Sequence, residues 1–317
     1  MAKLTLIGGG AMARAVARIL VKSGVDVHVY ARNTALVEEV EGIVLHDEMG
    51  PAVEGASVVF LAVPADSLLE ASEQYGEFAR GDHVVLTATR GVTDRFMLPH
   101  EMIRAMTCVR KIGYLGGPIH ARELTTGRQI NLVLASRYGE VVNGIRALIQ
   151  GTPIALHRSA DIVGVQVAGA IANVGSIASG IAAALDFGDT ARGVLLTHGL
   201  VDATRLGVAL GASASTFSGL AGVGELIPRH VTSMDRHVDL GRRVAEGEKL
   251  ANALVACDGH VEGVKTAEEA VKAADRLGLE LLLVPAVHDI LLGRADPREA
   301  LEAVLHKSLD LDHAINS

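Results

Sequence analysis

The chain begins with an apolar segment that runs directly into closely spaced small residues. Residues 4–13 read Leu-Thr-Leu-Ile-Gly-Gly-Gly-Ala-Met-Ala, which places Gly8, Gly10 and Ala13 in a G-x-G-x-x-A pattern. After a strand, the first glycine permits a tight turn, the second lets a pyrophosphate approach the backbone, and the third small residue lets a helix pack against the strand. Backbone N–H groups at the beginning of that helix would face the phosphates. The pattern therefore predicts a β-α-β unit that binds a dinucleotide.

The segments around the turn support this prediction. Residues 11–22 carry apolar side chains on one helical face and end before Ser23-Gly24, and residues 25–30 alternate like a second strand. The alternative is a glycine turn in an ordinary β-α-β unit that holds no ligand. For a bound dinucleotide, we expect contacts from Gly8 and Gly10 and from the backbone of Ala11, Met12 and Ala13.

The residues after the second strand bear on which dinucleotide is preferred. Sites for NAD usually place an Asp or Glu there, where it binds the ribose 2′-hydroxyl. No acid lies between Val27 and Leu36, and Arg32 stands where a guanidinium could hold a 2′-phosphate. The sequence therefore favours NADP (NADPH) as cofactor, with NAD as a second cofactor. The alternative is that Arg32 is a solvated surface residue.

Length and composition limit the class of protein. With 317 residues, of which 49% are hydrophobic and 21% charged, the chain can form two folded domains. The net charge of −8 argues against nucleic acid or an anionic membrane surface as partner. Two distant cysteines, Cys108 and Cys257, suit a reducing compartment, and with no signal peptide expected before the first strand we expect a cytoplasmic protein. The apolar stretch 162–185 is interrupted by polar residues and is expected to be a buried core helix.

Strand and helix signals alternate through the first half of the chain. Residues 57–63, 83–87 and 129–135 are apolar runs of the kind found in strands buried on both faces. We therefore expect an α/β fold for residues 1–158, a Rossmann-like, doubly wound parallel sheet that binds the dinucleotide.

The second half of the chain has a different pattern of apolar residues. Residues 159–317 show long helical periodicity with alanine and glycine, which predicts an all-α domain. Thr266-Ala-Glu-Glu269 and Asp296-Pro-Arg-Glu299 look like capping boxes at the beginnings of two helices.

Several motifs together give the chain a family resemblance. Over nearly its whole length it resembles NAD(P)-dependent glycerol-3-phosphate dehydrogenases, and motifs in the same order are more specific than any one alone. The matching segments are Thr87-Ala-Thr-Arg-Gly91, Gly117-Pro-Ile-His-Ala-Arg-Glu123, Asp161-Ile-Val-Gly-Val165, Gly169-Ala-Ile-Ala-Asn173, Thr216-Phe-Ser-Gly-Leu-Ala-Gly-Val-Gly-Glu225 and Val261-Glu-Gly263. The resemblance implies that the second half binds substrate and forms a homodimer.

The resemblance also implies a reaction, the interconversion of dihydroxyacetone phosphate and sn-glycerol 3-phosphate by hydride transfer. As the ketone oxygen gains charge, a cationic proton donor must lie beside it. The family pattern supplies a lysine in a Gly-Ala-Leu-Lys-Asn segment, and in this chain that position is Ala172. A methyl group cannot donate a proton, so the donor is unknown.

Other departures cluster where the resemblance places the substrate. Arg90 occupies the position of a family lysine and Glu225 that of a family aspartate. The segment Asp235-Arg236-His237 replaces the family's Ser-Arg-Asn. Further departures are Arg229 for threonine, His198 for arginine and His120 for phenylalanine. The resemblance implies contacts to a small, phosphorylated substrate from Arg90, Gly117, Asn173, Glu225, Arg236 and His237. It adds Arg90, Ala121 and Glu262 to the expected cofactor contacts.

These departures leave three interpretations open. In the first, the chain is still a dehydrogenase for this or a related anionic substrate, with His237 as the candidate donor and His198 or water as alternatives. In the second, catalysis is impaired and a nucleotide-binding sensor or partner subunit remains. A third, minor interpretation is an enzyme like pyrroline-5-carboxylate reductase, because the opening glycine run is similar.

No metal site is expected, since the thirteen histidines include no spacing typical of metal ligands. His230 and His237 lie seven residues apart with Asp235 between them and could share a helix face, which is the alternative to this expectation.

Overall fold

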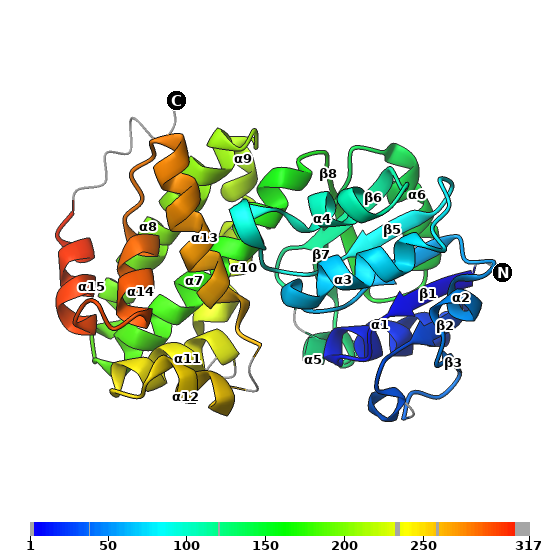
Figure 1. Cartoon of the computed structure of the whole chain (residues 1–317), viewed down its shortest axis with the longest axis horizontal. Helices are drawn as coiled ribbons and strands as arrows, with labels where there is room; N and C mark the ends of the chain where they lie inside the picture. Colours follow the sequence, from blue (N-terminus) through cyan, green and yellow to red (C-terminus); the bar gives the residue numbers. More distant parts are fainter. Residues whose placement is uncertain (1–2, 38, 120, 232–234, 258–259, 308–317) are drawn as a thin grey trace. The chain divides into compact units, whose positions relative to one another are not determined.

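The computed structural model describes residues 3–37, 39–119, 121–231, 235–257 and 260–307, and its chain divides into two compact units (Figure 1). Unit 1 comprises Met1–Thr89 and Pro99–Ile162, and unit 2 comprises Arg90–Leu98 and Val163–Ser317. A domain boundary between residues 158 and 159 remains a prediction. It differs from these units mainly at Arg90–Leu98, which packs with unit 2.

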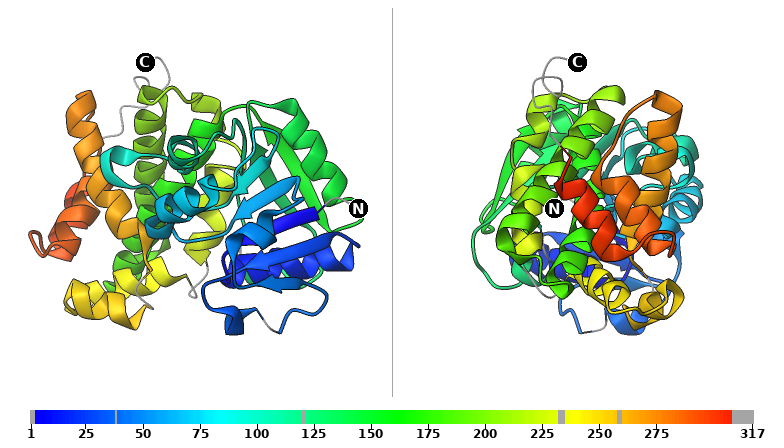
Figure 2. Two further views of the ribbon diagram at one scale, coloured as in Figure 1. Left: turned by 45° about the vertical axis from the view of Figure 1, so that its right-hand side comes forward. Right: turned by 90° about the vertical axis from the view of Figure 1, so that its left-hand side faces the viewer.

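Unit 1 is built on an eight-stranded sheet with the order β3-β2-β1-β4-β5-β6-β7-β8. Figure 2 (left) shows the early strands at one edge and the late strands at the other. The neighbouring strands are parallel except β6 and β7, which are antiparallel. The strands are β1 (Lys3–Ile7), β2 (Asp26–Tyr30), β3 (Val44–His46), β4 (Val58–Leu61), β5 (Val84–Thr87), β6 (Lys111–Gly116), β7 (Ile130–Ala135) and β8 (Ile154–Ser159). The predicted doubly wound, mostly parallel sheet is confirmed.

Helices in unit 1 follow the strands in the expected alternation. The predicted helix over 11–22 is α1 (Ala11–Lys22), whose buried face includes Ala15 and Ile19. Within the unit α1 packs on α5, and α3 packs on α4. The remaining helical segments are η1 (Thr34–Leu36), α2 (Met49–Val53), α3 (Ala65–Gly76), α4 (Pro99–Met106), α5 (Ala121–Leu124) and α6 (Gly139–Leu148).

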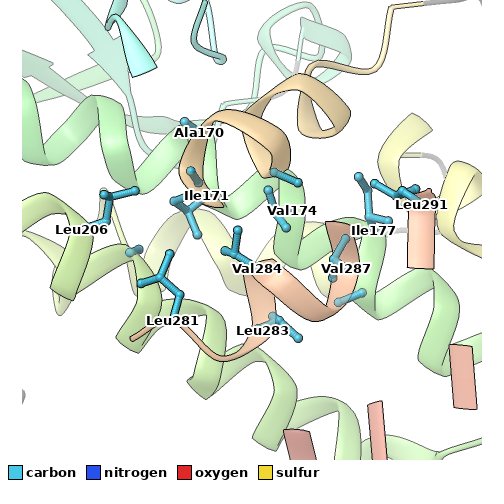
Figure 3. Packing of buried hydrophobic residues seen from close by; sticks show 14 of the residues in the cluster. Ala170, Ile171, Val174, Ile177, Leu206, Leu281, Leu283, Val284, Val287 and Leu291 are labelled. Atoms are coloured by element: carbon cyan, nitrogen blue, oxygen red, sulfur yellow. The ribbon is translucent and has the colours of Figure 1, made fainter. Parts of the chain in front are cut away.

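Helices are the main elements of unit 2 among its described residues. Its helical segments are η2 (Asp94–Phe96), α7 (Ile162–Ala184), α8 (Gly188–Ala209), α9 (Ala214–Phe217), α10 (Val223–Val231), α11 (Arg236–Ala245), α12 (Leu250–Ala256), α13 (Glu262–Leu277), α14 (Leu283–Leu291) and α15 (Pro297–Leu305). Figure 3 shows Ile171 and Val174 of α7 gathered with Val284 and Val287 of α14 in the core of this unit.

Helix α7 is the predicted core helix. By length and composition it could cross a membrane, but 89% of its most apolar window is buried inside the protein. The prediction for residues 162–185 is therefore confirmed, and the alanine and glycine content reflects close helix packing within unit 2.

The two predicted capping boxes have different outcomes. Asp296 caps α15, since its Oδ1 accepts hydrogen bonds from the N–H groups of Arg298 and Glu299. The prediction at Thr266 is wrong, because α13 begins a full turn earlier at Glu262 and the Thr266 hydroxyl donates to the Glu262 carbonyl. The buried face of α13 already begins at Gly263, so packing extends the helix past the local signal.

Candidate functional site

The glycine turn after β1 has the geometry that the sequence predicts. Gly8 has φ +125°, and a Cβ atom there would lie 2.5 Å from the carbonyl oxygen of Ala62. Its N–H group donates to the Tyr30 carbonyl at 2.8 Å, which links the turn to the end of β2. Only glycine fits both the backbone conformation and the close approach of β4. The turn therefore depends on the first residue of the pattern.

The beginning of α1 is open to a ligand. Gly10 is the N-cap residue, it makes no side-chain cap, and a Cβ atom added to it would meet nothing within 4 Å. The first turn of α1 contains no acidic residue, so no carboxylate occupies the positive end of the helix. The free N–H groups of Ala11, Met12 and Ala13 belong to this turn. A pyrophosphate fits this arrangement of backbone donors and open space.

A cavity of about 230 Å³ adjoins the turn within unit 1. Its lining combines the glycine loop with the ends of β2 and β4 and one face of α3. The lining residues are Ile7, Gly8, Gly9, Gly10, Tyr30, Ala31, Arg32, Asn33, Met49, Ala62, Val63, Pro64, Ser67, Glu70, Ala71 and Gln74. The structure thus brings Arg32 to the same cavity as the glycine turn, as its predicted role requires.

Helix α3 contributes a charged residue, Glu70, to this cavity, which was not predicted from the sequence. The Glu70 carboxylate lies 3.8 Å from the Arg32 guanidinium, measured from Oε2 to Nη1, and both side chains are largely exposed. The residues that directly follow β2 include no acid, whereas Glu70 reaches the cavity from α3, which follows β4. The signal available was the position of α3 directly after Val63-Pro64 at the carboxyl end of β4.

Two other predicted residues of unit 1 follow β6. Gly117 comes directly after this strand and has φ +84°, and Ala121 begins α5. Ala121 packs on an apolar cluster that includes Ala15 of α1. The structure therefore places Ala121 on the element that covers α1, while His120 lies outside the described residues.

In unit 2, three predicted substrate residues come together. The Arg90 guanidinium forms an ion pair with the Glu225 carboxylate, with Nη2 3.1 Å from Oε1. Their side chains are 14% and 1% exposed, so solvent screens this pair little. The amide of Asn173 donates to the Arg90 carbonyl at 3.2 Å. Arg90, Asn173 of α7 and Glu225 of α10 therefore form one buried group.

A second group lies at the beginnings of α11 and α13. Asp235 caps α11 by accepting from the His237 N–H at 2.8 Å, and the same Oδ1 lies 2.9 Å from His237 Nδ1. His237 Nε2 accepts from the Gly263 N–H at 3.2 Å and lies 3.7 Å from Glu262 Oε2. Both ring nitrogens are therefore engaged by the protein. Arg236 donates to the His260 carbonyl at 2.8 Å.

Close packing joins this second group to α7. A Cβ atom at Gly263 would lie 2.8 Å from His237 Cδ2 and 3.2 Å from the Asn173 carbonyl oxygen. The glycine of the Val-Glu-Gly motif is thus required by the approach of two helices. Asn173 takes part in both groups, through its side chain toward Arg90 and through its carbonyl toward Gly263.

Ala172 precedes Asn173 on α7 and is 1% exposed. Its side chain ends in a methyl group and has no proton to donate. His198 on α8 is equally buried, and burial lowers its pKa below the ordinary value, so it favours the neutral form. His198 is therefore a poor substitute for the cationic proton donor that the resemblance implies at the position of Ala172.

Metal binding finds no support in the described part of the chain, where no group of three or more His, Cys, Asp or Glu side chains could hold a metal ion. The side chains of His230 and Arg229 lie outside the described residues. The grouping of His230 with His237 therefore stays untested.

Comparisons with known proteins match both halves of the chain to one family. The family model for the N-terminus of NAD-dependent glycerol-3-phosphate dehydrogenase matches residues 40–142, and that for the C-terminus matches residues 161–302. A glycerol-3-phosphate dehydrogenase [NAD(P)+] of Nitratidesulfovibrio vulgaris is 32% identical, with 97% of this chain and 99% of the relative covered. This chain belongs to the NAD-dependent glycerol-3-phosphate dehydrogenase family.

Other relatives of the family agree. A glycerol-3-phosphate dehydrogenase [NAD(P)+] of Methylobacillus flagellatus is also 32% identical, with 96% of this chain and 98% of the relative covered. The predicted resemblance is confirmed. The agreement along both halves supports the dehydrogenase interpretation over the one based on pyrroline-5-carboxylate reductase.

Solved structures of the family share the fold. Glycerol-3-phosphate dehydrogenase of Coxiella burnetii superposes with a TM-score of 0.90 at 23% identity, covering 96% of this chain and 99% of that one. The Plasmodium falciparum glycerol-3-phosphate dehydrogenase gives a TM-score of 0.87 at 14% identity, covering 98% and 96%. The Rossmann-like sheet and the helical second half are therefore those of the family.

Proposed function

We propose that this chain is an NAD(P)(H)-dependent oxidoreductase that interconverts dihydroxyacetone phosphate and sn-glycerol 3-phosphate, or a related anionic substrate. The observation that carries the proposal is the 32% identity to a glycerol-3-phosphate dehydrogenase [NAD(P)+] over nearly the whole of both chains. The glycine turn adds geometric support, because it combines a φ that only glycine tolerates with an open helix N-terminus.

The proposed contacts to the dinucleotide begin at the glycine turn. In unit 1, Gly8, Gly10 and the first turn of α1 would bind the pyrophosphate, and Arg32 would bind a 2′-phosphate. Ala121, Arg90 and Glu262 are further proposed contacts. When bound, the nicotinamide supplies the hydride for the ketone carbon or accepts it in the reverse direction.

The proposed substrate contacts are Arg90, Gly117, Asn173, Glu225, Arg236 and His237. Glu225 neutralises much of the charge of Arg90, so Arg236 is the stronger candidate for the phosphate. Its bond to the His260 carbonyl uses one of five N–H donors, and the others can hold a phosphate in a forked arrangement. The same bond fixes the direction of the guanidinium.

Our candidate for the proton donor is His237. His237 lies between two carboxylates, with Nδ1 2.9 Å from Asp235 Oδ1 and Nε2 3.7 Å from Glu262 Oε2. In the geometry seen, however, Nε2 accepts from the Gly263 N–H, so donation requires that this bond be released. His198 and a water molecule remain the alternative donors.

A second candidate function follows from Ala172. Without a positioned acid, the rate of a carbonyl reduction falls by about 10²–10⁴. The chain would then act as a nucleotide-binding sensor or a partner subunit that keeps the family fold. Both candidates agree with binding of NADPH, so only turnover separates them.

The deciding experiment mixes the protein with NADPH and dihydroxyacetone phosphate and follows the absorbance of the reduced cofactor. Oxidation above background that is lost in Arg236→Ala supports the enzyme. Tight binding of NADPH without oxidation supports the second candidate and contradicts dihydroxyacetone phosphate as the substrate.

The variant Ala172→Lys tests whether the rest of the site is intact. Restoring an ammonium group beside Asn173 should raise turnover with dihydroxyacetone phosphate by at least about 10-fold, given the usual contribution of a positioned acid. The measurement is the steady-state rate at saturating NADPH, with Ala170→Lys on the same helix as control. An unchanged rate would mean that the pocket no longer accepts this substrate.

Two further proposals concern the location of the protein and its oligomeric state. We propose a cytoplasmic location, in line with its unpaired cysteines, and a homodimer, as the resemblance implies. Sedimentation of the purified chain measures the second property directly.

A further inference from the structure

The cavity beside the glycine turn contains two charged side chains of opposite sign. Among the described residues that line it, Arg32 and Glu70 are the charged ones, and their charged groups lie 3.8 Å apart. Together they contribute no net charge to the cavity. A ligand that enters the cavity therefore meets the Arg32 guanidinium together with the Glu70 carboxylate.

The position of Glu70 follows from the face that α3 presents. Ser67, Glu70, Ala71 and Gln74 all line the cavity, and they lie on one side of the helix at spacings of three and four residues. Glu70 is thus part of the cavity wall. Glu73, on the same helix, is exposed but does not line the cavity.

The two forms of the dinucleotide would respond differently to this pair. A 2′-phosphate carries a charge of about −1.5 to −2 at neutral pH, whereas a ribose 2′-hydroxyl is uncharged and can donate to a carboxylate. Arg32 attracts the phosphate, but Glu70 repels it and competes for the same guanidinium. The hydroxyl meets no such repulsion.

We propose that Glu70 is a specificity-determining residue for the dinucleotide. Its carboxylate limits the preference for NADP(H) that Arg32 gives, and the chain therefore binds NAD(H) as well. This inference rests on the proposed function, because it takes the cavity to be the dinucleotide site.

The test measures binding, so it does not depend on turnover. Titration calorimetry gives dissociation constants of NADPH and NADH for the full-length protein, Glu70→Gln and the matched control Glu73→Gln. Because the pair is exposed, Glu70→Gln should tighten NADPH by about 3- to 10-fold and leave NADH within about 2-fold. Glu73→Gln removes the same charge from the same helix and should leave the ratio of the two constants unchanged.

Two further measurements make the test specific. Arg32→Ala in the Glu70→Gln background should abolish the gain for NADPH, and the gain should shrink as salt is raised. Equal changes for both coenzymes, or an equal shift in Glu73→Gln, would overturn the inference. Failure of the unmodified protein to bind either coenzyme would overturn the proposed function as well, so the two failures are distinguishable.

Discussion

At the scale of single residues, Gly8 and Gly10 of the turn have different roles. Gly8 is required by the fold, because its φ is +125° and the Ala62 carbonyl leaves no room for a Cβ atom. Gly10 has φ −70° and open space around it, so any residue could adopt its backbone. What Gly10 provides is access to the beginning of α1. The same motif thus contains one residue for stability and one for binding.

This difference predicts a split between two variants. Gly8→Ala should lower the free energy of unfolding by about 2 kcal/mol, since it combines a strained φ with a steric clash. Gly10→Ala should change it by less than about 0.5 kcal/mol and still weaken NADPH binding, because the methyl group lies where a phosphate approaches. Denaturant unfolding and calorimetric titration measure the two effects. Equal destabilisation by both variants would contradict the assignment.

His28 of β2 and His46 of β3 form a histidine pair at one edge of the sheet. The rings stack, with His28 Nδ1 2.7 Å from His46 Nε2. Desolvation by burial lowers the pKa of both histidines, and for His46 the charge of His28 lowers it further. The folded state therefore binds fewer protons than the unfolded state. Stability from this pair is present above the unfolded pKa of about 6.5 and is lost as pH falls through the lower, folded values.

The measurement is the free energy of unfolding at pH 7.5 and at pH 5.5. The unmodified protein should lose more stability between these values than His46→Gln, which keeps a hydrogen-bonding group but cannot be charged. Identical losses would show that the pair does not titrate as described.

At the scale of elements, the segment Arg90–Leu98 illustrates how tertiary contacts hold a strained backbone. Arg95 and Phe96 have φ +64° and +59°, in the left-handed region that non-glycine residues rarely adopt. The Arg95 N–H donates to Glu269 Oε2 at 2.7 Å, and Phe96 is buried in the core of unit 2. Arg90 begins this segment, so the anchoring contacts also hold the residue that pairs with Glu225.

Glu269 should be the main anchor of that segment. It is 2% exposed and accepts from Arg95 N–H and Lys272, so Glu269→Gln should lower the free energy of unfolding by about 1–3 kcal/mol. Glu268→Gln is the matched control, because Glu268 contacts the same lysine but is 40% exposed. It should cost less than about 0.5 kcal/mol. A comparable cost for both variants would mean that the backbone contact is unimportant.

Relief of the strain provides an independent check. Arg95→Gly removes an exposed side chain and the left-handed penalty, so it should stabilise the protein by about 1 kcal/mol. Chemical unfolding of this variant measures the effect. Destabilisation would show that the side chain, and not the backbone, sets the energy of this segment.

Elements could be predicted from the sequence where local signals and packing agree. The turn, α1 and β2 lie within a residue of their expected bounds, and Asp296 caps α15 as expected. The antiparallel pairing of β6 with β7 could not be predicted, because it depends on connections that a strand's own residues do not encode. Buried Asp202, which accepts from three backbone N–H groups at the beginning of α14, likewise has no local signal.

At the scale of the whole molecule, the motifs predicted the family and the fold, while the site needed the structure. Arg90, Asn173 and Glu225 were expected near one another, and they form one buried group within unit 2. The engagement of both His237 nitrogens and the reach of Glu70 into the cavity could not be predicted. Each depends on segments that are far apart in the sequence, and their approach is set by packing and cannot be deduced from sequence spacing.

We propose that unit 1 holds a dinucleotide by its pyrophosphate at the beginning of α1. Calorimetric titration of the purified protein with NADPH and with NADH tests it most directly, with Gly10→Asp as the variant that places a carboxylate at the phosphate position. We predict binding of one coenzyme per chain, with NADPH preferred and affinity at least about 10-fold weaker in Gly10→Asp. Absence of binding by either coenzyme, or unchanged affinity in Gly10→Asp, would show that the beginning of α1 is not a pyrophosphate site.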